Sequence, residues 1–165
     1  FRAELRGLSH ALDQPVGRVY QHLCDVNVGG AKCGVDLDDP AYKTTGAVTA
    51  LRDEQSFIAD GFAGFSDGWF AHGLLTWFTG ANAGLAAHIK TQTENGAIAL
   101  WLPPGASIQL GDAFTATAGC DKRFATCREK FSNAVNFRGQ PFMPGNDFAI
   151  SYPLKGEKND GGKLK

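Results

Sequence analysis

The sequence has no excess of charge of either sign: 16 Lys and Arg residues stand against 17 Asp and Glu residues, for a formal net charge of −1. This balance argues against a surface that binds nucleic acid mainly by neutralising phosphates, and against electrostatic docking to a membrane. Charged residues are only 20% of the chain and hydrophobic residues are 43%. A packed core is therefore expected, and disorder over the whole chain is excluded. The 165 residues fit one domain, or two small ones.

Long apolar runs are also missing. The longest candidate, residues 69–78, is interrupted by His72 and Gly73, so we expect no membrane insertion by this chain. The first residues lack the apolar core of a signal peptide, and the chain does not begin with Met. We therefore expect a processed product or part of a longer protein.

Signatures of catalysis are scarce. Residues 64–68 match the G-x-S-x-G string of a hydrolase nucleophile, but the segment after them reads as a strand, whereas the motif requires a strand-to-helix turn. A polar turn is the better interpretation. The histidines show no metal-ligand spacing, and no phosphate-binding glycine loop occurs; they are His10, His22, His72 and His88. We expect a protein that is not an enzyme.

The middle of the chain, residues 42–118, predicts a small β-barrel or sandwich. The 21 glycines indicate a turn-rich protein, and Asn95-Gly96 between two strand-like runs is a strong hairpin signal. Gly111-Asp112 predicts another turn, between strand-like residues 107–110 and 113–118. An aromatic cluster fits the core of such a barrel better than a partner-binding face; its members are Phe62, Phe65, Trp69, Phe70, Trp77 and Phe78.

Short helices are predicted on both sides of this region. In residues 1–41, apolar residues recur at helical spacing over residues 1–12 and again over residues 16–23. In residues 119–153, Asp121 is placed as an N-cap before a helical stripe of aromatic residues and a cysteine. The Lys-rich residues 154–165 are expected to form a flexible charged tail.

Four cysteines flank the β region in two pairs, Cys24 with Cys33 and Cys120 with Cys127. Two disulfides would need an oxidising compartment, and four unrelated buried thiols would be scattered through the core instead. Metal ligation is therefore favoured. The spacings exceed those of zinc knuckles and suit a [4Fe–4S] cluster better, with zinc as the alternative. Nearby basic residues either offset thiolate charge or form a solvated face; they are Lys32, Lys122, Arg123, Arg128 and Lys130.

Two long blocks carry a resemblance to a known family. Residues 1–37 (FRAELRGLSHALDQPVGRVYQHLCDVNVGGAKCGVDL) and 119–153 (GCDKRFATCREKFSNAVNFRGQPFMPGNDFAISYP) resemble the C-terminal part of phage tail baseplate hub proteins of prophages and gene transfer agents. The segments GWFAHGLLTWFTGANAG and ALWLPP are similar as well. The cysteine arrangement is similar to that of the phage lambda tail-tip protein L, whose C-terminal part carries an iron–sulfur cluster.

The resemblance implies a virion structural protein at the tail tip, assembled in the bacterial cytoplasm. It implies that Cys24, Cys33, Cys120 and Cys127 ligate a [4Fe–4S] cluster. It also implies a homotrimer, docking to the distal tail protein and the fibre-bearing tail-tip protein, and DNA delivery through the lumen of the hub. From the residues alone, a zinc-stapled protein in the same role and a redox iron–sulfur protein stay open as alternatives.

Overall fold

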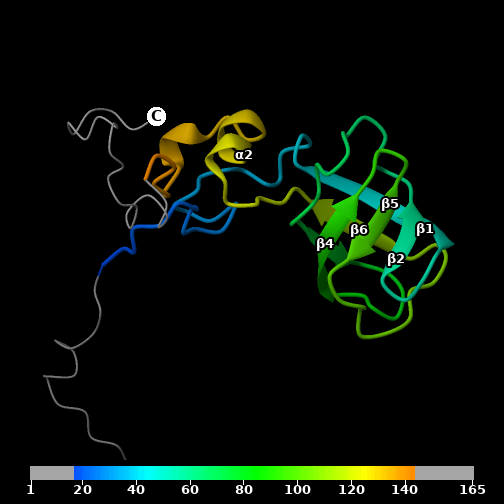
Figure 1. Cartoon of the computed structure of the whole chain (residues 1–165). Coiled ribbons are helices and arrows are strands. Elements are labelled where there is room, and N and C mark those ends of the chain that lie inside the picture. Colours follow the sequence, from blue (N-terminus) through cyan, green and yellow to red (C-terminus); the bar gives the residue numbers. More distant parts are fainter. Residues whose placement is uncertain (1–16, 144–165) are drawn as a thin grey trace, which may run out of the picture.

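The computed structural model describes residues 17–143 of the chain. In these residues, a β-barrel lies beside a smaller part that contains the one α-helix described (Figure 1). The elements in chain order are β1 Lys43–Leu51, β2 Ser56–Ala59, β3 Leu74–Trp77, β4 Ala86–Gln92, β5 Ala97–Leu100, β6 Ala113–Thr117, α2 Phe124–Glu129 and the 3-10 helix η1 Ala134–Asn136.

The six strands form a closed barrel in the order β1-β2-β5-β4-β3-β6, and all pairs are antiparallel. The predicted mainly β architecture is confirmed, and the barrel form of it is observed. Two register shifts, between Val48 and Ala50 and between Ile89 and Thr91, interrupt the pairing. Such irregularities bend a strand and increase its twist, which helps a small sheet to close.

Side chains fill the barrel interior in the alternating pattern expected for a two-faced strand. In β6, for example, Phe114 and Ala116 are fully buried while their neighbours are not. Of the predicted aromatic cluster, three members are buried, Phe65 and Trp69 are partly buried, and only Phe78 is exposed. The largest fully buried side chains are Trp77, Phe57, Phe62, Phe70 and Phe114.

The predicted hairpin at Asn95-Gly96 is confirmed. It joins β4 to β5, and Gly96 has a φ of 76°. A Cβ at Gly96 would lie 1.9 Å from the carbonyl oxygen of Ala59. The turn therefore needs glycine both for its backbone conformation and for the close approach of β2.

Two predicted strand segments are shorter or absent. In residues 69–78 only β3 is a strand, because successive turns occupy the residues before it, including His72 with a φ of 61°. Residues 107–110 form no strand. Gln109 donates its N–H to the Asp112 carboxylate, 2.9 Å away, and both sides of β6 are already paired with β1 and β3.

The remaining described residues, 17–41 and 119–143, lie against one another; we call them the cysteine lobe. The helix predicted over residues 16–23 is wrong where the structure describes it, because residues 17–41 contain no helix or strand. Val19 and Tyr20 are 79% and 78% exposed, so the apolar stripe lacks the packing that stabilises a short helix. The predicted helix over residues 1–12 and the tail over 154–165 lie outside the described residues.

The helix predicted after residue 119 is confirmed as α2, with one correction. Its N-cap is Arg123, not Asp121. Asp121 instead accepts a hydrogen bond from the Arg123 N–H in the turn before the helix, at 3.0 Å. None of the helices in residues 17–143 has the length and apolar character to cross a membrane.

Aromatic packing joins the cysteine lobe to the barrel. The Tyr42 ring stacks on Trp69 with ring centres 6.4 Å apart, and it contacts Phe131 of the lobe at 5.1 Å. The Lys130 ammonium donates hydrogen bonds to the carbonyls of Trp69 and Gly119. Because these contacts come from both parts, the barrel positions the lobe.

Candidate functional site

The four cysteines come from the two segments of the cysteine lobe, two from each. Cys24 and Cys33 lie in the irregular segment before β1, Cys120 follows β6, and Cys127 lies on α2. Cys33 and Cys127 are buried and the other two are partly exposed, and all four are free thiols.

The thiols are close enough to influence one another electrostatically. Burial, followed by the charges of Cys120, Cys33 and Cys24, raises the pKa of Cys127 to about 11. Burial also raises the pKa of Cys120, and a charge on Cys24 raises it further. The fold therefore brings the two cysteine pairs, which lie on opposite sides of the β region in the sequence, near one another.

Within residues 17–143, no group of three or more His, Cys, Asp or Glu side chains has the arrangement needed to hold a metal ion. The four thiols are thus neighbours in one lobe without forming a compact set of ligands. Their donor chemistry still fits an iron–sulfur cluster, which takes four thiolates and hydrogen bonds to sulfur. Two such hydrogen bonds are present, from the backbone N–H of Lys122 to Cys120 Sγ at 3.3 Å and from Asn133 to Cys33 Sγ at 3.7 Å.

Asn133 connects the two buried cysteines. Its Nδ2 donates to the carbonyl oxygen of Cys33 at 2.6 Å, and its backbone N–H donates to the carbonyl oxygen of Cys127 at 2.9 Å. The Cys127 thiol in turn donates to the Asn133 carbonyl at 3.3 Å. Asn133 was not among the residues predicted from the sequence, because a single Asn after a short helix carries no periodic or motif signal.

Of the five basic residues near the cysteines, Lys32 is exposed, and the other four divide into two kinds. Arg123 and Arg128 are exposed and pair with the acidic neighbours Asp121 and Glu129, so these two arginines form the solvated face. The Lys122 side chain is directed to a backbone carbonyl inside the lobe, and the Lys130 side chain to the carbonyls of Gly119 in the lobe and Trp69 beside it. Burial lowers the pKa of Lys130 to about 8, and the charge of Cys120 opposes that shift.

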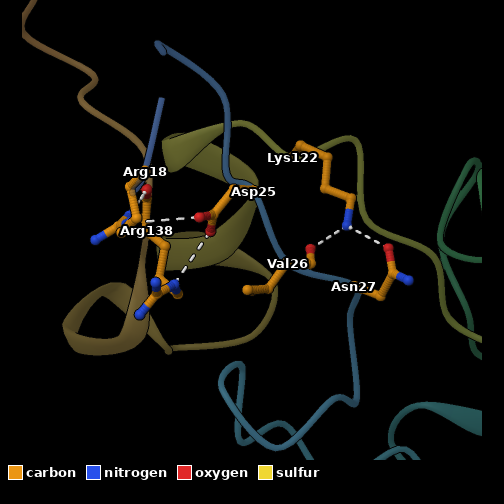
Figure 2. Close-up of polar contacts among 6 residues, drawn as sticks. All are labelled: Arg18, Asp25, Val26, Asn27, Lys122 and Arg138. Atoms are coloured by element: carbon orange, nitrogen blue, oxygen red, sulfur yellow. Dashed lines mark hydrogen bonds and ion pairs between the residues drawn. The ribbon is translucent and has the colours of Figure 1, made fainter. Parts of the chain in front are cut away.

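A clasp holds the two chain segments of the lobe together (Figure 2). Asp25 accepts hydrogen bonds from Arg138 Nε at 3.1 Å and Arg18 Nε at 3.3 Å, and Arg18 also donates to the Arg138 carbonyl. Burial alone would raise the pKa of Asp25, but the hydrogen bonds and charges of Arg138 and Arg18 hold it below its ordinary value. The clasp joins the residues next to Cys24 to the end of the described chain.

We expect Asp25→Asn to reduce the thermal stability of the protein at pH 7 and to weaken its acid dependence. The folded state binds a proton at Asp25 less tightly than the unfolded state, so the stabilisation is present above pH 3.8 and is lost as the pH falls through the lower folded-state pKa. Melting curves at pH 7 and pH 3 measure the difference. Glu129→Gln, which removes an exposed pair within one helix, is the control and should change little. An identical pH profile for Asp25→Asn and the wild type contradicts the assignment.

The remaining candidate features, a turn and two cavities, add little to the site formed by the cysteines. Residues 64–68 form a turn, as predicted, with no strand-to-helix geometry. A cavity of about 610 Å³ lies between residues 51–54 and 103–108, away from the cysteines. A smaller one of about 440 Å³ lies beside Cys120 and is also lined by His72 and His88, so two histidines that are unremarkable in the sequence lie near the lobe.

Comparisons with known proteins relate the chain to phage and gene transfer agent proteins. Residues 1–36 match the family model of the baseplate hub protein N-terminal attachment domain, and residues 68–147 match the model of the phage conserved hypothetical protein BR0599. A chain in the solved structure described as the virion of a native gene transfer agent particle is 39% identical, with a TM-score of 0.76. The match covers 97% of this chain and 56% of that one, so this chain spans just over half the length of that relative. No curated protein matches the chain.

Proposed function

We propose that this chain, which resembles the phage tail baseplate hub proteins, is a structural part of the tail tip of a phage-like particle or gene transfer agent. The observation that carries the proposal is the 39% identity over nearly the whole chain to a chain of a gene transfer agent virion. The match of residues 1–36 to a baseplate hub domain supports the same role. The chain acts as a structural component and not as an enzyme.

Within this role, we propose that Cys24, Cys33, Cys120 and Cys127 hold a [4Fe–4S] cluster. The support is the donor set: four free thiols that interact electrostatically, and hydrogen bonds from Lys122 and Asn133 to two of the sulfurs. A cluster held by four cysteines would supply a covalent link between the two segments of the lobe. Because all its iron sites would carry protein ligands, it would leave no position for a substrate.

The hub assembles with copies of itself and with neighbouring tail proteins. The relative is a chain of a virion particle, which supports contacts with other tail proteins. We propose a homotrimer that binds the distal tail protein and the fibre-bearing tail-tip protein, assembles in the bacterial cytoplasm, and surrounds the path of the DNA. The closed barrel would provide the rigid body of each subunit.

Metal and sulfide analysis of anaerobically purified protein tests the cofactor. We expect four irons and four acid-labile sulfides per chain, with a brown charge-transfer absorption. One zinc per chain would show that the cysteines bind zinc in place of the cluster, and it would exclude a redox iron–sulfur protein. Four thiols that titrate freely, without either metal, would refute the metal centre.

Light scattering of the same preparation tests the hub role separately. We expect a trimer, and a stable complex after the distal tail protein is added. A protein that stays monomeric and does not bind the tail proteins would refute the hub role, whichever metal is found.

A further inference from the structure

Lys122 occupies an unusual backbone position between two of the cysteines. Its φ is 67°, a left-handed conformation that side chains other than Gly, Asn and Asp adopt rarely. The residue follows Cys120 by two positions and lies against the segment that contains Cys24. A strained conformation of this kind persists only where surrounding contacts hold it.

The backbone of Lys122 contacts both cysteine segments. Its N–H donates to Cys120 Sγ at 3.3 Å, and its carbonyl oxygen accepts the N–H of Cys24 at 2.9 Å. One residue therefore links the sulfur of one cysteine to the main chain of another. In the sequence these two cysteines are on opposite sides of the barrel.

The side chain of Lys122 makes a second link to the same segment (Figure 2). Its ammonium group donates to the carbonyl of Val26 and to Asn27 Oδ1, the latter at 3.2 Å. Arg123 and Arg128 pair with acidic neighbours instead, and Lys130 binds carbonyls next to the barrel. Of these four basic residues, Lys122 is the one that holds the Cys24 segment.

We propose that Lys122 is a positioning residue that fixes Cys24 opposite Cys120, so that thiols from two distant segments are directed to one cofactor. The cofactor part of this inference rests on the proposed function, whereas the positioning part concerns the protein alone. A positive charge beside the sulfurs also favours a negatively charged cluster and influences its reduction potential.

The first test uses cofactor-free protein and a bifunctional thiol reagent that joins neighbouring cysteines. Mass spectrometry of peptides measures the rate at which Cys24 is crosslinked to Cys120. We expect Lys122→Met, which keeps the length of the side chain but loses the charged hydrogen bonds, to reduce this rate about tenfold. Arg123→Met, at the exposed neighbouring position, should leave the rate unchanged.

The second test uses protein loaded with iron and sulfide. We expect Lys122→Met to lose iron to a chelator about tenfold faster than the wild type and to have a more negative reduction potential, whereas Lys122→Arg restores part of the potential. A residue that only stabilised the fold would not shift the potential. Asn27→Ala, which removes one acceptor of the ammonium group, serves as a second variant and should show a smaller effect in the same direction if Lys122→Met does not fold.

The outcomes separate the two proposals. If the wild type takes up no iron, the cofactor is refuted, and the crosslinking rate still decides the positioning role. If the wild type binds the cluster and both Lys122→Met and Asn27→Ala match it in crosslinking rate, iron release and potential, the role of Lys122 is refuted. If Lys122→Gly, which readily adopts the left-handed backbone, matches the wild type in all three readouts, the ammonium group has no positioning role and the inference is overturned.

Discussion

Gly119→Ala is expected to lower the free energy of unfolding by at least about 3 kcal/mol, the upper end of the usual effect of overpacking a core. Gly119 is buried, and a Cβ there would lie 2.0 Å from the backbone N of Gly73 and 2.0 Å from the carbonyl carbon of His72. Both are main-chain atoms, so no flexible side chain can move aside. The two glycines let the chain leaving β6 pass directly over the turn before β3.

Chemical denaturation followed by tryptophan fluorescence measures this change. Gly105→Ala is the matched control, because a Cβ there meets only the end of the Leu85 side chain at 3.4 Å, and Gly105 is exposed. We expect the control to stay within about 0.5 kcal/mol of the wild type. Equal stabilities for the two variants would show that the approach of Gly119 to Gly73 does not constrain the fold. Because Cys120 is the next residue, Gly119→Ala should also disturb the cysteine lobe.

The second large effect is expected for Cys127→Ser in protein loaded with the proposed cluster. Serine at this buried position removes one thiolate ligand, and we expect loss of the bound iron. A cofactor that links Cys33 to Cys120 closes residues 34–119 into a loop, which by the loop-closure model for disulfides contributes about 4 kcal/mol for a loop of this size. Melting curves with and without a chelator measure the loss.

Cofactor-free protein is the control for this experiment. There, Cys127→Ser should change the stability at pH 7 much less than in the loaded protein, because no link is lost. If the wild type melts at the same temperature with and without the chelator, the cofactor does not stabilise the protein by linking the two segments of the lobe.

The stability of the cofactor-free protein is also expected to depend on pH through Cys127. The folded state holds the proton of Cys127 more tightly than the unfolded state, since the pKa rises from 9.0 to about 11 on folding. This stabilisation is present below pH 9 and is lost as the pH rises to about 11. The cofactor-free wild type should therefore lose more stability over this range than Cys127→Ser. Lys130, whose pKa of about 8 has the opposite effect, is the same in both proteins and cancels in the comparison.

The barrel could be predicted from the sequence because its signals are local. Asn95-Gly96 specifies its own turn, and strand-like residues lie on both sides of it. The order of the strands, with β5 between β2 and β4, has no local signal. The strand predicted over residues 107–110 is absent for a related reason. Both edges of β6 are already paired, with β1 and β3, and this pairing cannot be read from the local sequence.

The sequence predicts which residues are important in the cysteine lobe, but not the backbone structure that holds them. Four cysteines and an adjacent helix are visible in the sequence, and the structure brings the thiols together. The helical stripe that includes Val19 and Tyr20 suggests a packed helix, but nothing among the described residues covers it. Lys122 and Asn133 act through contacts with segments about a hundred residues away in the chain, and no spacing rule indicates such contacts.

The closed barrel limits how neighbouring subunits can join. Every strand of the ring has both of its edges occupied by hydrogen-bonded neighbours, so the barrel offers no free edge to which a strand of another chain could be added. In the proposed hub, contacts between subunits would therefore use loops and side-chain surfaces, such as the exposed Trp101 and Leu102. A particle built from such units can place many copies next to one another without the sheets fusing into a continuous, aggregating β-structure.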